Sequence, residues 1–191
     1  VPGDATELAF ASIAELSHWL RTRAITSQTL TRLSLDRLKQ HGPTLHCVIS
    51  LMEEQAMIQA KQADTELDAG RWRGPLHGIP WGAKDLFDTK DAPTTWGAAT
   101  HRNRQPTSNA VVIDRLEQAG AVLVAKLSLG ALAYGDIWFG GRTNNPWNTD
   151  DGSSGSSAGS AAATAAGLVG FALGTETCGS IVSPSMRCGA T

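Results

Sequence analysis

Several features that define common classes of protein are missing from this sequence. Its three cysteines, Cys47, Cys178 and Cys188, form no CxxC pair. That pattern argues against a disulfide framework or a zinc site, and it favours a reducing compartment such as the cytoplasm. No apolar stretch reaches about 18 residues without polar interruption, so no membrane span is predicted. No basic run accompanies the net charge of -2, so nucleic acid is not expected as a direct partner.

The two ends of the sequence lack the usual signals of a complete chain. Val1 is not an initiator methionine, and the terminal CGAT has neither a helix stop nor a polar tail. We therefore expect the N-terminal portion of a longer chain. Removal of a signal segment from an exported precursor would also explain Val1.

The first 70 residues carry mainly helical patterns. Capping hydroxyls precede the apolar faces, and glycine or proline follows them. These signals predict helices over 12–21, from Thr26 or Ser27 to Gly42-Pro43, and over 53–69, with a short strand over 46–50.

Residues 74–191 alternate between strand and helix patterns. The predicted elements are a strand within 74–89, a helix over 109–119, a strand over 121–126, a helix over about 157–167 and a strand over 169–174. Residues 130–152 are predicted to form loops. This alternation argues for an α/β domain whose sheet is covered by helices.

The run GSSGSSAGS at 152–160 places five serines directly before an apolar segment, and no histidine follows His101. A glycine-serine loop that caps a helix is the simplest interpretation. A phosphate-binding loop would end in GK[ST], but no lysine follows Lys126. Residues 155–159 match the nucleophile-elbow pattern G-x-S-x-G with Ser157 at its centre. An elbow needs a preceding strand, which NNPWNTDDG does not predict.

A lysine base would need no histidine, because neutral lysine can deprotonate a serine directly or through a second hydroxyl. The S-x-x-K form of this chemistry is absent, but Lys84 stands in GIPWGAKD after an apolar strand. Burial would lower its pKa from about 10.4 towards neutrality, which the chemistry requires. An ion pair with Asp85 is the alternative role for Lys84.

Five segments together resemble the amidase signature family: GPLHGIPWGAKD, AGAVLVAK, NNPWN, GSSGSSAGSAAATAAGLVGFALGTETCGSIVSP and the terminal CGAT. The resemblance implies an α/β fold with a mixed, twisted β-sheet covered by α-helices, incomplete at the C-terminus. Residues 1–191 would be the N-terminal part of a single domain, helical over 1–70 and with a catalytic core segment over 74–191.

The resemblance also implies a Ser-cisSer-Lys triad. Ser180 would be the nucleophile, Ser156 the bridging serine after a cis peptide bond, and Lys84 the base. The remaining implied site residues are the oxyanion donors Thr177, Cys178, Gly179 and Ser180, with Ser157, Ala133 and Tyr134 at the substrate.

Two of these regions have an alternative interpretation. The side chains of Ile137 and Trp138, which follow Tyr134, could be packed into the core instead of lining an acyl pocket. Cys178 replaces a family glycine, and we expect it to be a small buried hydrophobic residue rather than a redox group.

The implied function is hydrolysis of a carboxylic amide through an acyl-enzyme, with no cofactor and no metal. The expected partner is a small-molecule amide, and the protein could form a homodimer. Two alternatives remain: the A subunit of the Glu-tRNA(Gln)/Asp-tRNA(Asn) amidotransferase with its partner subunit, or a catalytically incomplete fragment. The WFGG loop before NNPW favours a stand-alone amidase.

Overall fold

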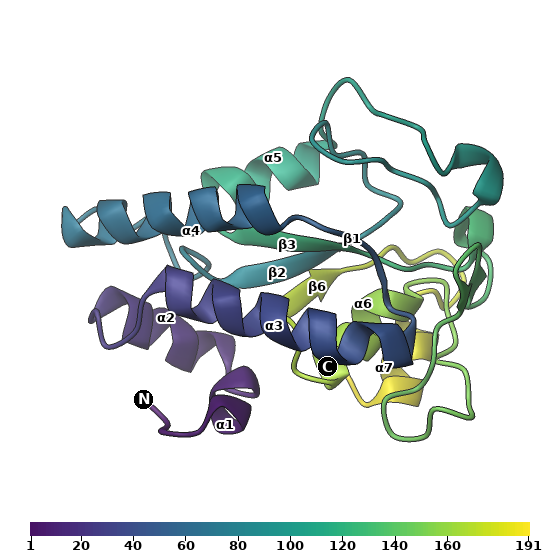
Figure 1. Cartoon of the computed structure of the whole chain (residues 1–191), viewed down its shortest axis with the longest axis horizontal. Helices are drawn as coiled ribbons and strands as arrows, with labels where there is room; N and C mark the ends of the chain where they lie inside the picture. The colour runs from purple at the N-terminus through teal and green to yellow at the C-terminus, as the bar shows by residue number, and fades with distance from the viewer.

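The computed structural model describes residues 1–191 (Figure 1). The helices are α1 (Ala5–Ala9), α2 (Ile13–Arg21), α3 (Ser27–Leu45), α4 (Glu53–Asp68), α5 (Val111–Gln118), α6 (Ala158–Ala165) and α7 (Val182–Cys188). The strands are β1 (Val48–Leu51), β2 (Pro80–Lys84), β3 (Val122–Leu127), β4 (Ile137–Trp138), β5 (Gly141–Arg142) and β6 (Phe171–Leu173). No helix has the length and apolar content needed to cross a membrane.

The central sheet has four strands in the order β1-β3-β2-β6. Strand β1 is antiparallel to β3, whereas β2 is parallel to both β3 and β6. The expected mixed α/β fold is therefore confirmed. Strands β4 and β5 form a separate two-stranded ribbon.

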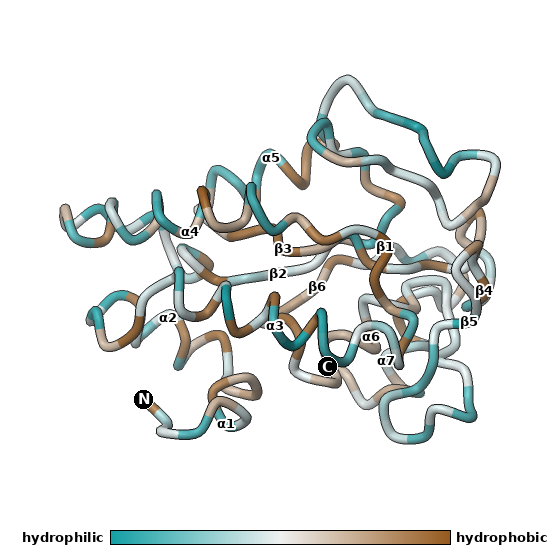
Figure 2. The backbone as a smooth tube through the Cα atoms, in the orientation of Figure 1, coloured by the Kyte–Doolittle hydropathy of each residue, from teal (hydrophilic) through white to brown (hydrophobic).

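Helices cover both faces of the sheet. In Figure 1, α5 lies on one side of the strands, and α1, α2 and α3 lie on the other. Helix α4 lies beside α3, and its buried Ala56 and Ala60 pack in one cluster with α3, α6 and β3. Trp81 and Leu123 pack with Ile113 of α5, while Val122 and Val124 belong to the cluster that includes α3 and α6. Figure 2 shows hydrophobic residues along β3 and β6 and hydrophilic residues in the long loop between β2 and α5. Burial of both faces is why these short strands are almost entirely apolar.

The predicted end of helix α3 at Gly42-Pro43 is wrong. Helix α3 continues through Pro43 to Leu45 and ends where His46 adopts a left-handed conformation with φ 48°. Leu45 is buried in the main core cluster, so its packing sustains one more turn despite the lost backbone donor of the proline. Helices α1 and α7 were not predicted, because both are short.

The sheet brings three distant segments to one edge. Strands β2 and β6 are parallel neighbours, so their C-terminal ends lie at the same edge of the sheet. Lys84 is the last residue of β2, and Thr175 follows β6 by two residues. The serine loop leads into α6, which packs against this part of the sheet.

Candidate active site

Lys84 is fully buried at the end of β2, and hydroxyl groups surround its amine. Its Nζ donates hydrogen bonds to Ser156 Oγ at 2.7 Å, Thr175 Oγ1 at 2.7 Å and Ser157 Oγ at 3.1 Å. Lys84 makes no ion pair. All three N–H bonds of the ammonium form thus have a hydroxyl acceptor. Because a hydroxyl can also donate, the same three groups can hydrogen-bond to the neutral amine.

The surroundings of Lys84 make proton release easier. Burial lowers the pKa of the Lys84 amine to about 8, while the negative charge of Glu176 opposes this shift. Desolvation disfavours the charged form of a lysine, and hydroxyls restore only part of the lost hydration. With this pKa about a tenth of Lys84 is neutral at pH 7 and able to accept a proton, far more than at the ordinary lysine pKa of 10.5.

The alternative ion pair between Lys84 and Asp85 is not formed. Consecutive residues of a strand point to opposite faces of the sheet, and Asp85 instead pairs with Lys126 at 2.7 Å. Because Lys84 and Asp85 are adjacent in the sequence, their side chains lie on opposite faces of the sheet.

The Gly155–Ser156 peptide bond is cis, as the family resemblance implied. Backbone groups hold this segment from two sides. The Ser156 carbonyl accepts a hydrogen bond from the Gly130 N–H at 3.3 Å, and the Ser157 N–H donates to the Ser180 carbonyl at 2.9 Å. Ser156 and Ser157 are both buried.

Ser180 lies in the loop between β6 and α7 and is partly exposed. Its backbone is fixed to Ser157, but its hydroxyl makes no hydrogen bond within the structure. Lys84 and Ser156 are thus in direct contact, whereas no hydrogen bond joins the Ser156 and Ser180 hydroxyls. In enzymes without substrate such catalytic contacts are commonly long and tighten in the reacting complex.

The carboxylate of Glu176 lies against the backbone that precedes α7. It accepts hydrogen bonds from the N–H groups of Gly179 and Ser180, the second at 3.0 Å, and also from the next two residues. These backbone bonds lower the pKa of Glu176. The N–H groups of Thr177 and Cys178 make no hydrogen bond within the structure. Of the four expected oxyanion donors, two are therefore already bonded to an internal carboxylate.

The expectation that Cys178 is buried is wrong, and the core-packed alternative does not hold for Ile137. Cys178 is exposed rather than buried, because it lies in the loop that leads to Ser180. Ile137 is not core-packed, since 66% of its surface is exposed. Tyr134 is also exposed, whereas Ala133 and Trp138 are partly buried. The Trp138 Nε1 donates to the His46 carbonyl at 3.1 Å. This bond anchors the β4–β5 ribbon, and it does not make Trp138 part of a core.

Two residues of this site were not predicted from the sequence. Thr175 directly contacts the Lys84 amine, and Glu176 binds the backbone beside Ser180. Both belong to the GTETCGS block, and the signal available in the sequence was their polar character in the same block as Ser180.

The structure does not contain the nucleophile elbow considered for Ser157. The preceding strand, β5, ends at Arg142, so a long loop leads into Ser157. The ring nitrogens of His77 and His101 contact residues away from the serine loop. No group of three or more potential metal-ligating side chains is present.

Gly155 must lack a side chain, because the loop at Gly135 lies directly against it. A Cβ atom at residue 155 would overlap the carbonyl group of Gly135. We predict that Gly155→Ala lowers the free energy of unfolding by about 1–3 kcal/mol, as other overpacked positions do. Urea unfolding measures this change. Gly3→Ala is the matched control, since nothing lies within 4 Å of its added Cβ, and equal stability of the two variants would contradict the prediction.

The known proteins that are similar to this chain point to one family. The family model described as Amidase matches residues 29–191. The A subunit of Glutamyl-tRNA(Gln) amidotransferase from Coxiella burnetii is 43% identical over 183 residues, which cover 94% of this chain and 38% of that relative.

Solved structures agree with the sequence comparison. The peptide amidase of Stenotrophomonas maltophilia superposes with a TM-score of 0.85 at 36% identity, covering 92% of this chain and 38% of that enzyme. A fatty acid amide hydrolase gives a TM-score of 0.90 at 26% identity, covering 97% of this chain and 33% of that enzyme. The chain therefore spans well under half the length of these relatives. The family match and the shared fold together establish that this chain belongs to the amidase signature family.

Proposed function

We propose that this protein hydrolyses a carboxylic amide to a carboxylate and an amine through the triad Lys84, Ser156 and Ser180. The observation that carries the proposal is the 2.7 Å contact of the buried Lys84 amine with Ser156 Oγ, with no carboxylate bound to that amine. A lysine in this state accepts a proton near neutral pH. Membership of the amidase signature family supports the same chemistry.

In the proposed first half-reaction the proton moves along the two serines. Ser156 gives its hydroxyl proton to the neutral Lys84 Nζ and takes the proton of Ser180. The Ser180 Oγ then forms a bond to the carbonyl carbon of the amide. When the tetrahedral intermediate collapses, the C–N bond breaks and the proton returns through Ser156 to the leaving nitrogen.

Water completes the second half-reaction by the same route. Lys84 and Ser156 remove a proton from water, which attacks the ester carbon of acylated Ser180. The ester C–O bond breaks, the carboxylic acid leaves, and the proton returns to Ser180. Amide and water are thus converted to carboxylic acid and amine with no other reactant, and proton transfer between the two products gives carboxylate and ammonium.

The backbone N–H groups of Thr177, Cys178, Gly179 and Ser180 would stabilise the oxyanion. Loss of one donor of this kind costs about 2.7–4 kcal/mol in the transition state. Glu176 now accepts from Gly179 and Ser180, so its carboxylate would have to yield these donors to the developing oxyanion.

The substrate would lie beside the serine loop and the loop 130–136, which are in contact at Gly155 and Gly135. We propose that Ser157, Ala133 and Tyr134 contact it, because this contact places the loop 130–136 next to the serine loop. The exposed aromatic ring of Tyr134 suits an apolar acyl group. Within this proposal, residues 1–191 form the N-terminal part of one amidase domain, which could function as a homodimer.

A second candidate is the A subunit of a tRNA-dependent amidotransferase. The 43% identity with the Coxiella burnetii protein favours it. The same triad would then release ammonia from an amide donor for use by a partner protein. Purification of the intact protein alone, active on simple amides, would favour the stand-alone hydrolase. Co-purification with a second protein chain, with activity only in that complex, would favour the amidotransferase.

We predict that a fluorophosphonate probe labels the intact protein at Ser180. Peptide mapping locates the label. Lys84→Ala should abolish labelling, because the relay then has no base, whereas Lys39→Ala should retain it, since Lys39 lies at a surface ion pair with Glu53. A label on Ser157, or no label at all, would overturn the proposal.

We also predict the pH dependence of the reaction. Because the active form of Lys84 is the neutral amine and its pKa is about 8, kcat/KM should rise with pH and level off above that value. Below it, the rate should fall about tenfold for each pH unit. Initial rates on a small amide between about pH 6 and 9.5 measure this limb. A flat profile below pH 8 would contradict a lysine base with this pKa.

A further inference from the structure

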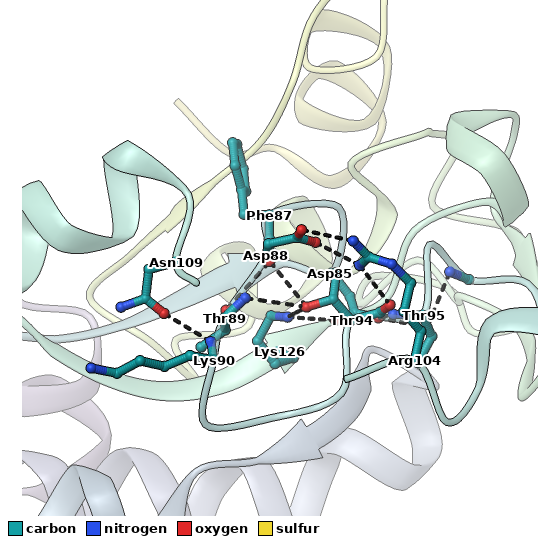
Figure 3. Close-up of polar contacts among 11 residues, drawn as sticks. Asp85, Phe87, Asp88, Thr89, Lys90, Thr94, Thr95, Arg104, Asn109 and Lys126 are labelled. Carbon is teal, nitrogen blue, oxygen red and sulfur yellow. Dashed lines mark hydrogen bonds and ion pairs between the residues drawn. The ribbon is translucent and has the colours of Figure 1, made fainter. Parts of the chain in front are cut away.

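A second buried lysine lies on the opposite face of the sheet from Lys84. Lys126 of β3 is fully buried and pairs in register with Ala83, the residue before Lys84. Its Nζ donates to Asp85 Oδ1 at 2.7 Å and to Thr94 Oγ1 at 2.9 Å. Figure 3 shows the Lys126 side chain directed at this group. The two lysines thus differ in their hydrogen-bond partners, because the amine of Lys126 contacts a carboxylate and that of Lys84 contacts only hydroxyls.

Both carboxylate oxygens of Asp85 accept hydrogen bonds within this cluster. Its Oδ2 accepts from the Thr95 N–H at 2.7 Å and from Thr95 Oγ1 at 2.5 Å. Its side chain is fully buried, so solvent does not screen its charge. Its backbone N–H donates to the Leu127 carbonyl at 2.9 Å, which fixes the end of β2 where Lys84 lies.

We propose that Lys126 is a positioning residue, whose ammonium cancels the charge of Asp85 and so leaves the adjacent Lys84 able to act as a neutral base. This inference rests on the proposed function. A carboxylate near a lysine favours the ammonium form, and charges interact strongly in a poorly hydrated interior. With Lys126 in place, Asp85 contributes one half of a neutral pair instead of an isolated negative charge.

The other charged groups around the two lysines support this division. On the Lys84 face, Glu176 is the only charged neighbour that acts on it, and the packed elements α6 and β6 carry no charged residue. On the Lys126 face, Asp88 and Arg104 form a further ion pair at 2.6 Å. Both carboxylates close to Lys126, Asp85 and Asp88, therefore have a cation as partner.

The test is a set of charge variants of the intact protein. Lys126→Gln removes the cation but keeps a hydrogen-bond donor for Asp85. The double variant Asp85→Asn with Lys126→Gln removes both charges. Lys39→Gln is the control, because its ion pair with Glu53 is at the surface. The titration of Lys84 is followed by the chemical shift of 13Cε-labelled lysine, and the pH profile of kcat/KM is measured on the same samples.

We expect Lys126→Gln to move the Lys84 midpoint to higher pH by about half a unit to one unit. The double variant should return it to the wild-type value, and Lys39→Gln should not move it. General structural damage would lower activity at every pH without this reversal. An unchanged midpoint in Lys126→Gln, or an equal shift in the double variant, would overturn the proposal.

A further variant keeps the proposal testable if Lys126→Gln does not fold. Asp85→Asn alone leaves Lys126 as an unpaired cation, so the Lys84 midpoint should move to lower pH, and an unchanged or higher midpoint would overturn the inference. The spectroscopic titration needs no activity. If the Lys84 midpoint moves as expected and the rate profile does not follow it, charge compensation is supported and Lys84 is not the base.

Discussion

This structure depends on one constraint, a buried lysine amine that has no carboxylate partner. Lys84 has lost its hydration and contacts only the hydroxyls of Ser156, Ser157 and Thr175. Burial of a charge without a counterion is costly, so the proton becomes easier to release. The same environment that weakens the ammonium therefore leaves an amine that can accept a proton next to a serine, without a histidine.

The sheet makes this environment possible. Three segments, at the ends of β2 and β6 and before α6, must meet around one amine, and the parallel pairing of β2 with β6 brings them to a single edge. Glycine at position 155 allows the loop at Gly135 to approach the serine segment. On the other face, Lys126 occupies Asp85 and so keeps that carboxylate from acting alone beside Lys84.

Local patterns predicted most elements and the lysine itself, because apolar strands, caps and glycine stops are properties of short segments. They could not show where the side chains point. The register of β2 with β3 is irregular between Trp81 and Gly82, and Lys126 lies on the Asp85 face although Val122 and Val124 pack with α3. That irregularity, the passage of α3 through Pro43 and the exposure of Cys178 depend on tertiary packing, which no local pattern contains.

The stability of Lys84→Met as a function of pH tests the central claim most directly. The folded-state pKa of about 8 lies below the ordinary value of 10.5, so the folded protein binds this proton less tightly than the unfolded chain. The cost is complete below pH 8 and disappears as pH rises to 10.5. Lys84→Met should therefore be more stable than wild type at about pH 7 by up to about 3 kcal/mol, with the difference closing by pH 10.5. A less stable variant near neutral pH, or a difference that does not change with pH, would contradict the account.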